Sequence, residues 1–240
     1  MIIWKKNPIF FRKNHTFLDS IKLNQEELEH LRSLRLDRED KQVEFRDGKG
    51  NSYIYFISSK KDTGNLIESS KNVVQDLEIS LACALPKSQK LDFILQKGTE
   101  LGVTNFHLIT FLQSDRKEVN EERAQKIILA AVGQSRRHSI PSLNIHNSLQ
   151  SYLDTQPNSF YLHPYSHPKI TSLSNFSLNP VIGPEGGFRE EEINLFTEYN
   201  CSGYNLGENI LRIETAAIYI TSLIQYEKLR TQNDWYRQKA

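Results

Sequence analysis

The residues best suited to chemistry lie in a turn at positions 183–187, between a short apolar run and a helical pattern. Gly183, Gly186 and Gly187 lack a Cβ, so a ligand can approach their backbone, and Pro184 fixes one φ inside the turn. Such a turn is suited to form the floor of a site for a flat ligand. An ordinary strand-to-helix turn is the alternative interpretation of this stretch taken alone.

Two further segments have the same sequence context, because each follows directly after a short apolar run. Residues 161–164 end in His163 and Pro164, and residues 205–216 carry Gly207 and Arg212 ahead of another helical pattern. Ligands of open parallel sheets bind beyond the carboxyl ends of the strands. We therefore expect the three segments to lie side by side and to form one site.

The hydrophobic periodicity predicts two parts with a boundary near residue 75. Residues 1–75 contain short apolar runs, one helical pattern at 25–34 that begins after Asn24, and a hairpin signal at 47–50. The expected structure of this part is a small β-rich barrel with one helix.

From residue 76 the pattern changes to strands that alternate with helices. Strands are expected at 79–85, 105–110, 143–145, 160–162, 181–182 and 204–206, and helices at 91–101, 121–136, 189–199 and 214–229. This alternation predicts an α/β fold in which a parallel sheet is covered by helices on both faces.

Composition and missing motifs exclude several classes of protein. The net charge is +1, and no apolar window is long enough for a signal peptide or a membrane span, so we expect a cytoplasmic protein. Cys83 and Cys201 have neither disulfide nor metal spacing, so we expect two structural thiols and no metal. The turn after residues 79–85 has no glycine, and the Walker A, zinc hydrolase and Gly-x-Ser-x-Gly patterns are absent.

Motifs along most of the chain resemble, in this order, those of the ribosomal RNA small subunit methyltransferase E family. They lie at residues 85–87, 96–103, 121–124, 134–135, 162–164, 182–188, 206–207 and 210–217. That family belongs to the SPOUT class of knotted methyltransferases. The resemblance implies a PUA-like, RNA-binding β-barrel at 1–75 and a SPOUT domain with a C-terminal trefoil knot at 76–240. It also implies a homodimer formed through the knot region.

The activity implied is methylation of N3 of a uridine in 16S ribosomal RNA, with S-adenosylmethionine as donor. The three loops would surround the donor, and the residues assigned to it are Leu162, His163, Pro164, Ile182, Gly183, Pro184, Glu185, Gly186, Gly187, Leu206, Gly207, Ile210, Leu211, Ile213, Glu214, Thr215 and Ala216. Loss of the N3 proton places negative charge on O2 and O4, which a fixed arginine would stabilise. Arg212 and Arg116 are the candidates, with salt-bridge or phosphate-contact roles as the alternative.

Basic clusters are the candidates for RNA contacts, and an ordinary solvated surface is the alternative for each of them. The residues concerned are Lys5, Arg12, Arg32, Arg35, Arg136 and Arg137. Glu185 and Glu214 are read as turn and helix-start carboxylates in preference to a general base. The partner that the resemblance implies is 16S ribosomal RNA or the small ribosomal subunit. Two other functions stay open: a non-catalytic RNA-binding ribosome-assembly factor on the same fold, and a methyltransferase for another RNA position.

Overall fold

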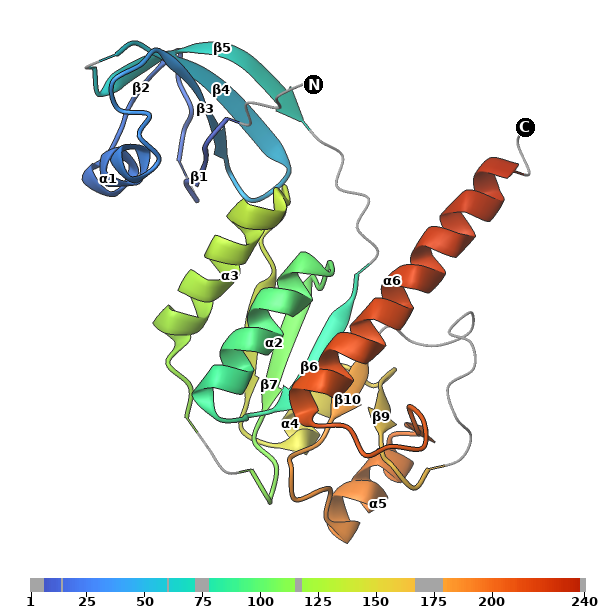
Figure 1. Ribbon diagram of the computed structural model, residues 1–240. Helices are drawn as coiled ribbons and strands as arrows, with labels where there is room; N and C mark the ends of the chain where they lie inside the picture. Colours follow the sequence, from blue (N-terminus) through green and yellow to red (C-terminus); the bar gives the residue numbers. More distant parts are fainter. Residues whose placement is uncertain are drawn as a thin grey trace. The chain divides into compact units, whose positions relative to one another are not determined.

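A computed structural model describes residues 7–13, 15–59, 61–71, 78–114, 118–166 and 179–237, with side chains described as far as residue 230. The chain forms two compact units, Met1–Gln75 with Val132–Ile140, and Asp76–Ala131 with Pro141–Ala240. Figure 1 shows the elements of each unit. The first unit thus takes its residues from two separate stretches of the sequence.

The first unit is built on a small barrel-like sheet of five strands in the order β1-β3-β4-β5-β2. The strands are β1 (Ile9–Phe11), β2 (Ser20–Lys22), β3 (Lys41–Arg46), β4 (Asn51–Ile57) and β5 (Thr63–Lys71). The predicted hairpin is confirmed: β3 and β4 pair antiparallel, and Gly48 and Gly50 have φ of 78° and 105°. Asp47 supports this turn by accepting hydrogen bonds from the backbone amides of Lys49 and Asn51 at 2.7 and 3.1 Å.

Helix α1 (Gln25–Ser33) closes the core of this unit. Asn24 accepts from the amide of Glu27 at 2.8 Å, and Glu27 accepts from the amide of Asn24 at 2.8 Å, so the helix start predicted at Asn24 is confirmed. Leu31 is 1% exposed and belongs to a core shared with Val43, Tyr55 and other apolar side chains of the sheet.

The second unit contains a sheet of six strands in the order β11-β9-β10-β6-β7-β8, all pairs parallel. The strands are β6 (Ser80–Ala84), β7 (Asn105–Ile109), β8 (Ser142–His146), β9 (Phe160–Leu162), β10 (Pro180–Ile182) and β11 (Gly203–Tyr204). The expected parallel α/β sheet is confirmed. Since β11, β9 and β10 are neighbours, the three loops that follow them leave the sheet at one edge.

Helices lie on both faces of this sheet (Figure 1). They are α2 (Ser88–Glu100), α3 (Glu121–Ser135), α4 (Leu149–Leu153), α5 (Glu190–Glu198) and α6 (Ile213–Arg237). Helix α2 lies on the face of Phe106, whereas Tyr152 of α4 packs on His107 from the opposite face. The short α4 was missed from the sequence, because five residues are too few to show a helical period. None of the helices among the described residues is long and apolar enough to cross a membrane.

The predicted stop of helix α2 at Gly102 is confirmed. Gly102 has φ of 93°, and the next amide, that of Val103, donates back to the carbonyl of Gly98 at 2.9 Å. A Cβ at Gly102 would also collide with the side chain of Gln225 on α6. Glycine is therefore required both by the backbone and by the packing of α2 on α6.

Candidate functional site

A pocket opens at the carboxyl edge of the parallel sheet, with a volume of about 580 Å³. We call it the loop pocket, because the loops after β9, β10 and β11 supply most of its wall. Its lining residues are Lys90, Leu162, His163, Pro164, Ile182, Gly183, Pro184, Glu185, Gly187, Phe188, Leu206, Gly207, Asn209, Ile210, Leu211, Arg212, Ile213 and Ala216. The three segments singled out in the sequence therefore meet at one place.

The glycine turn after β10 is shaped by its contact with Phe188. A Cβ at Gly183 would lie 2.7 Å from the ring of Phe188, so a larger residue at 183 would displace that ring. The ring packs edge-to-face on Phe111 and Phe196, with centroid distances of 5.4 and 5.2 Å. Gly187 has φ of 79°, and its amide donates to the carbonyl of Pro184 at 2.9 Å. The floor of the pocket is thus a tight turn that lies against an aromatic layer.

Gly186 faces away from the loop pocket, so its expected place in the floor is not what the geometry shows. A Cβ at Gly186 would lie 2.6 Å from the side chain of Gln113, in the loop that follows β7. With its amide oxygen turned toward Arg189, Gln113 accepts from the Arg189 guanidinium at 2.8 and 2.7 Å and donates to the carbonyl of Gly186. Gly186 is therefore the point at which the loop after β7 contacts the glycine turn, on the side that does not face the pocket.

A second contact joins the same two loops. The buried carboxylate of Glu192 accepts from the backbone amide of Leu112 at 2.8 Å and from that of Arg189 at 2.8 Å. Glu192 thus satisfies an amide at the start of α5 and an amide of the β7 loop at once.

The loops after β9 and β11 are tied by Asn205, which is 7% exposed. Its side-chain nitrogen donates to the carbonyl of Pro164 at 2.9 Å, and its oxygen accepts from the amide of Gly207 at 2.7 Å. The amide of His163 donates to the carbonyl of Tyr204 at 2.8 Å, which continues the strand pairing into these loops. The part of the pocket wall formed by the loops after β9 and β11 is thereby fixed by backbone and amide contacts.

Charged groups meet at one wall of the pocket. Lys90, in the first turn of α2, bonds to Glu185 of the glycine turn and lies 3.8 Å from Oε2 of Glu214. The hydrogen bond to Glu185 raises the pKa of Lys90, and the same bond lowers the pKa of Glu185. Both groups are therefore charged at neutral pH. Arg212 lines the pocket beside them.

Most of the residues assigned to the donor line this pocket, with three exceptions. Gly186, Glu214 and Thr215 do not line it, although Glu214 approaches the lining residue Lys90. Of the two catalytic candidates, Arg212 lines the pocket, whereas Arg116 lies outside the described residues.

Lys90, Phe188 and Asn209 also line the pocket, although they are not among the residues assigned to the donor from the sequence; Phe188 and Asn209 lie within the segments singled out there. The sequence pattern contains no signal for Lys90, because its place depends on the strand order of the sheet. Strand β6 adjoins β10 and leads directly into α2, so the first turn of that helix had to lie at the same edge of the sheet.

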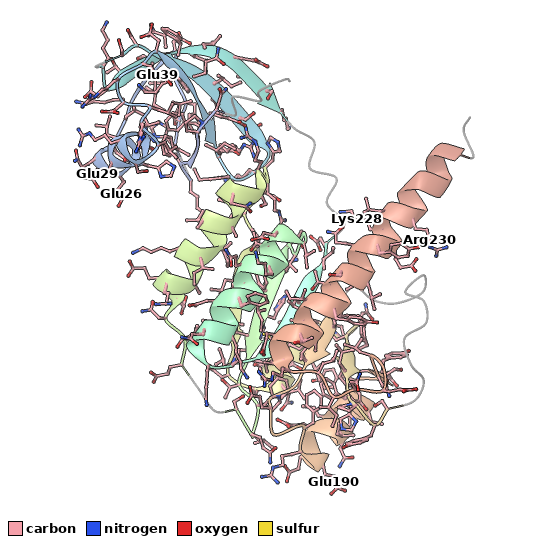
Figure 2. All side chains as sticks on the ribbon, in the orientation of Figure 1. Glu26, Glu29, Glu39, Glu190, Lys228 and Arg230 are labelled. Atoms are coloured by element: carbon pink, nitrogen blue, oxygen red, sulfur yellow. The ribbon has the colours of Figure 1, made fainter. Side chains whose placement is uncertain are left out.

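Two of the basic residues expected to contact RNA are exposed. Arg32 and Arg35 lie at the end of α1, and Arg35 has φ of 58°, because it closes the helix in a left-handed conformation. The surface of α1 also carries acids, since Glu26 and Glu29 project outward from it (Figure 2).

Arg12 is engaged within the first unit. Its guanidinium bonds to the carboxylate of Glu27 at 2.6 and 2.8 Å and to the carbonyl of Lys22 at 2.7 Å. It also lies over the ring of Phe45, 5.0 Å from the ring centroid. The contacts of Arg12 are those of a structural residue. Lys5 lies outside the described residues.

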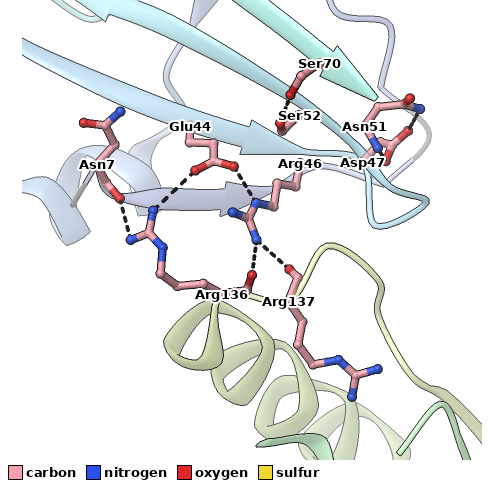
Figure 3. Close-up of polar contacts among 9 residues, drawn as sticks. All are labelled: Asn7, Glu44, Arg46, Asp47, Asn51, Ser52, Ser70, Arg136 and Arg137. Carbon is pink, nitrogen blue, oxygen red and sulfur yellow. Dashed lines mark hydrogen bonds and ion pairs between the residues drawn. The ribbon is translucent and has the colours of Figure 1, made fainter. Parts of the chain in front are cut away.

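A charge network within the first unit involves the remaining arginines (Figure 3). Arg46 donates to Glu44 at 2.6 Å and to the carbonyls of Arg136 and Arg137 at 2.6 and 2.7 Å. The guanidinium of Arg136 lies 3.5 Å from Glu44 in turn, while that of Arg137 contacts Ser139 at 3.4 Å. Arg136 and Arg46 thus share one buried carboxylate, and the end of α3 is bonded to β3.

The chain contains an RNA methyltransferase domain, as comparison with known proteins shows. Residues 74–225 match the family model described as the RNA methyltransferase domain. The chain is 33% identical over 181 residues to ribosomal RNA small subunit methyltransferase E of Rickettsia conorii, covering 72% of this chain and 74% of the relative. It is 31% identical over 191 residues to the Bacillus subtilis protein of the same name, covering 71% and 75%. The chain belongs to the ribosomal RNA small subunit methyltransferase E family.

Solved structures agree on the fold. The structure of a ribosomal RNA small subunit methyltransferase E from Neisseria gonorrhoeae, bound to S-adenosylmethionine, has a TM-score of 0.79 at 24% identity and covers 92% of this chain and 98% of that one. A predicted RNA methyltransferase from Thermotoga maritima has a TM-score of 0.72 at 25% identity and covers 92% and 98%.

Proposed function

We propose that this protein transfers a methyl group from S-adenosylmethionine to N3 of a uridine in 16S ribosomal RNA. The observation that carries the proposal is the loop pocket, which three family motifs form together at the carboxyl edge of the parallel sheet. A related protein from Neisseria gonorrhoeae binds S-adenosylmethionine, which supports the same donor here.

The pocket has the size and polarity that a nucleoside donor needs. Its volume of about 580 Å³ lies within the ~300–1,000 Å³ of small-molecule sites. Leu162, Ile182 and Ile213 give it a buried apolar surface for the faces of an adenine ring. The turn at 183–187 and the loop that begins at Leu206 offer backbone amides and carbonyls for the edge of the ring.

Methyl transfer from a sulfonium needs little covalent assistance, because the leaving group is neutral. The protein contributes by holding the nucleophile in line with the methyl group, and by stabilising the charge that spreads to O2 and O4 when N3 is deprotonated. Arg212 is the pocket side chain that we assign to this charge. Glu185 is a poor base, since its pKa is lowered by the bond to Lys90.

We also propose the trefoil knot and the homodimer that family membership implies. The support for the knot is the position of β9 between β10 and β11, together with the packing of α6 on β6 and β10. The support for the dimer is apolar surface on α6 and beside the pocket: Tyr226 is 63% exposed, Leu229 57% and Ile210 70%. In this arrangement the first unit, a PUA-like element, positions the RNA.

The test is quantitative mass spectrometry of 16S ribosomal RNA from cells with and without the gene, followed by methylation of the unmodified RNA or small subunit by purified protein. We expect one 3-methyluridine to disappear from the cells and to be restored in vitro. A methyl group found at another atom or in another RNA would overturn the assignment to uridine N3. Absence of donor binding by calorimetry would favour a non-catalytic assembly factor.

A further inference from the structure

The charged wall of the loop pocket is not used by the transfer chemistry proposed above. Lys90 of α2 and Glu185 of the glycine turn line the pocket there, and Glu214, at the start of α6, approaches Lys90 from outside the lining. The side chains of Lys90 and Glu214 are 26% and 20% exposed, so both groups are partly withdrawn from water. A cation and two carboxylates are thus held at the edge of a pocket whose lining is largely apolar and also includes Arg212.

These groups retain binding capacity for a ligand of mixed charge. An ammonium group has three N–H donors, and Lys90 makes one hydrogen bond, to Glu185, among the described residues. Oε2 of Glu214 is buried and has no hydrogen-bond partner within the described part of the chain, with Lys90 at 3.8 Å. A buried carboxylate oxygen without a donor is unfavourable, so the wall is incomplete until a further donor arrives.

An acceptor for Lys90 and a donor for the two carboxylates can come from one ligand group, the zwitterionic head of an α-amino acid. The apolar lining at Leu162, Ile182 and Ile213 suits the rest of a nucleoside-linked amino acid. We propose that Lys90 binds the carboxylate, and Glu185 and Glu214 the ammonium group, of the amino-acid end of the methyl donor. This inference rests on the proposed function, because it divides the donor site into an adenosine part and an amino-acid part.

The first experiment measures the affinities of the unaltered protein for four compounds by calorimetry. They are S-adenosylmethionine, S-adenosylhomocysteine, decarboxylated S-adenosylmethionine and 5′-methylthioadenosine. Charge-assisted hydrogen bonds are about twice as strong as neutral ones, so we expect loss of the carboxylate to weaken binding about tenfold and loss of the whole head to weaken it further. Equal affinity for S-adenosylmethionine and its decarboxylated form would overturn the inference.

The second experiment uses Lys90→Gln and Glu185→Gln. Lys90→Gln should weaken S-adenosylmethionine about tenfold and leave decarboxylated S-adenosylmethionine within about twofold, because that compound has no carboxylate for Lys90 to bind. Glu185→Gln should weaken the decarboxylated compound, which keeps its ammonium group, more than it weakens 5′-methylthioadenosine. A loss that is the same for all four compounds would show a structural ion pair and would overturn the assignment.

Lys97→Gln is the matched control, since Lys97 lies on the same helix and pairs with Glu100 at 2.8 Å, outside the loop pocket. It should leave all four affinities unchanged. S-adenosylhomocysteine separates the two sources of positive charge, because it keeps the ammonium group and lacks the sulfonium. If Glu185→Gln weakens S-adenosylmethionine and spares S-adenosylhomocysteine, the carboxylates face the sulfonium and the inference fails.

Failure of the inference differs from failure of the proposed function. If none of the four compounds binds the unaltered protein, the donor site itself is wrong. If all four bind with similar affinity, the donor site stands and its amino-acid part is wrong.

Discussion

The side chain of Asn205 donates a 2.9 Å hydrogen bond to the carbonyl of Pro164, joining the loop after β11 to the loop after β9. The same side chain accepts from the amide of Gly207 at 2.7 Å, so one buried amide holds two walls of the loop pocket.

Asn205→Ala should lower donor affinity more than it lowers stability. It leaves the carbonyl of Pro164 and the amide of Gly207 without their partner, and because both hydrogen bonds are only partly buried the expected loss of stability is about 1 kcal/mol. We expect a thermal shift of a few degrees and a loss of at least about tenfold in donor affinity. Calorimetry and thermal denaturation measure the two effects. Asn144→Ala, on β8 and away from the loop pocket, is the control, and an equal loss of affinity in that variant would contradict the prediction.

Gly183→Ala tests the floor of the pocket. The new Cβ would lie 2.7 Å from the ring of Phe188, and forcing that ring aside costs about 1–3 kcal/mol. Donor affinity should fall because Phe188 lines the pocket. The contrasting change is Gly133→Ala in α3, where a Cβ meets no described atom within 4 Å. That substitution should raise stability by about 0.5–1 kcal/mol and leave donor binding unchanged. Undiminished affinity in Gly183→Ala would show that the floor tolerates a side chain.

A buried histidine pair predicts a loss of stability in acid. Nδ1 of His107 lies 2.9 Å from Nε2 of His146, and burial, with His146 as a second cause, lowers the pKa of His107 to about 4. Burial also lowers the pKa of His146. Histidine in the unfolded chain takes up a proton near its ordinary pKa of about 6.5. Between these two pKa values the unfolded state binds more protons, so stability is lost as the pH falls.

The size of this effect for His107 is about 3 kcal/mol by pH 4, at about 1.4 kcal/mol for each pH unit. Hydrogen exchange of β7 and β8 peptides at several pH values measures it within the second unit. His107→Gln should flatten the dependence, whereas His15→Gln, at an exposed site of the first unit, should not. A dependence unchanged by His107→Gln would show that other groups are responsible.

Arg32 and Arg35 should contribute phosphate contacts if the first unit positions RNA. Arg32→Gln combined with Arg35→Asn removes both charges, and asparagine tolerates the left-handed conformation of position 35. RNA affinity should fall, and the slope of its logarithm against that of salt should flatten by up to about two units. Arg12→Gln should instead lower stability and leave the slope unchanged, because Arg12 is bonded to Glu27. An unchanged slope in the double variant would exclude these arginines as phosphate contacts.

The sequence by itself was enough to predict the features that depend only on residues close together in the chain. The start of α1 at Asn24, the hairpin around Asp47 and the stop of α2 at Gly102 follow from side-chain and backbone preferences within a few positions. The three loop segments could be placed together as well, since the ends of parallel strands share an edge of the sheet.

Tertiary structure decided which distant groups meet. Lys90 reaches Glu185 because β6 lies beside β10, and Gln113 holds Gly186 because the β7 loop returns to the same edge. Arg12 forms an ion pair with Glu27 within the first unit, because strand pairing and the position of α1 bring the two side chains together. Strand order and packing determine which side chains far apart in the sequence become partners. The local pattern of residues along the sequence specifies neither the strand order nor the packing.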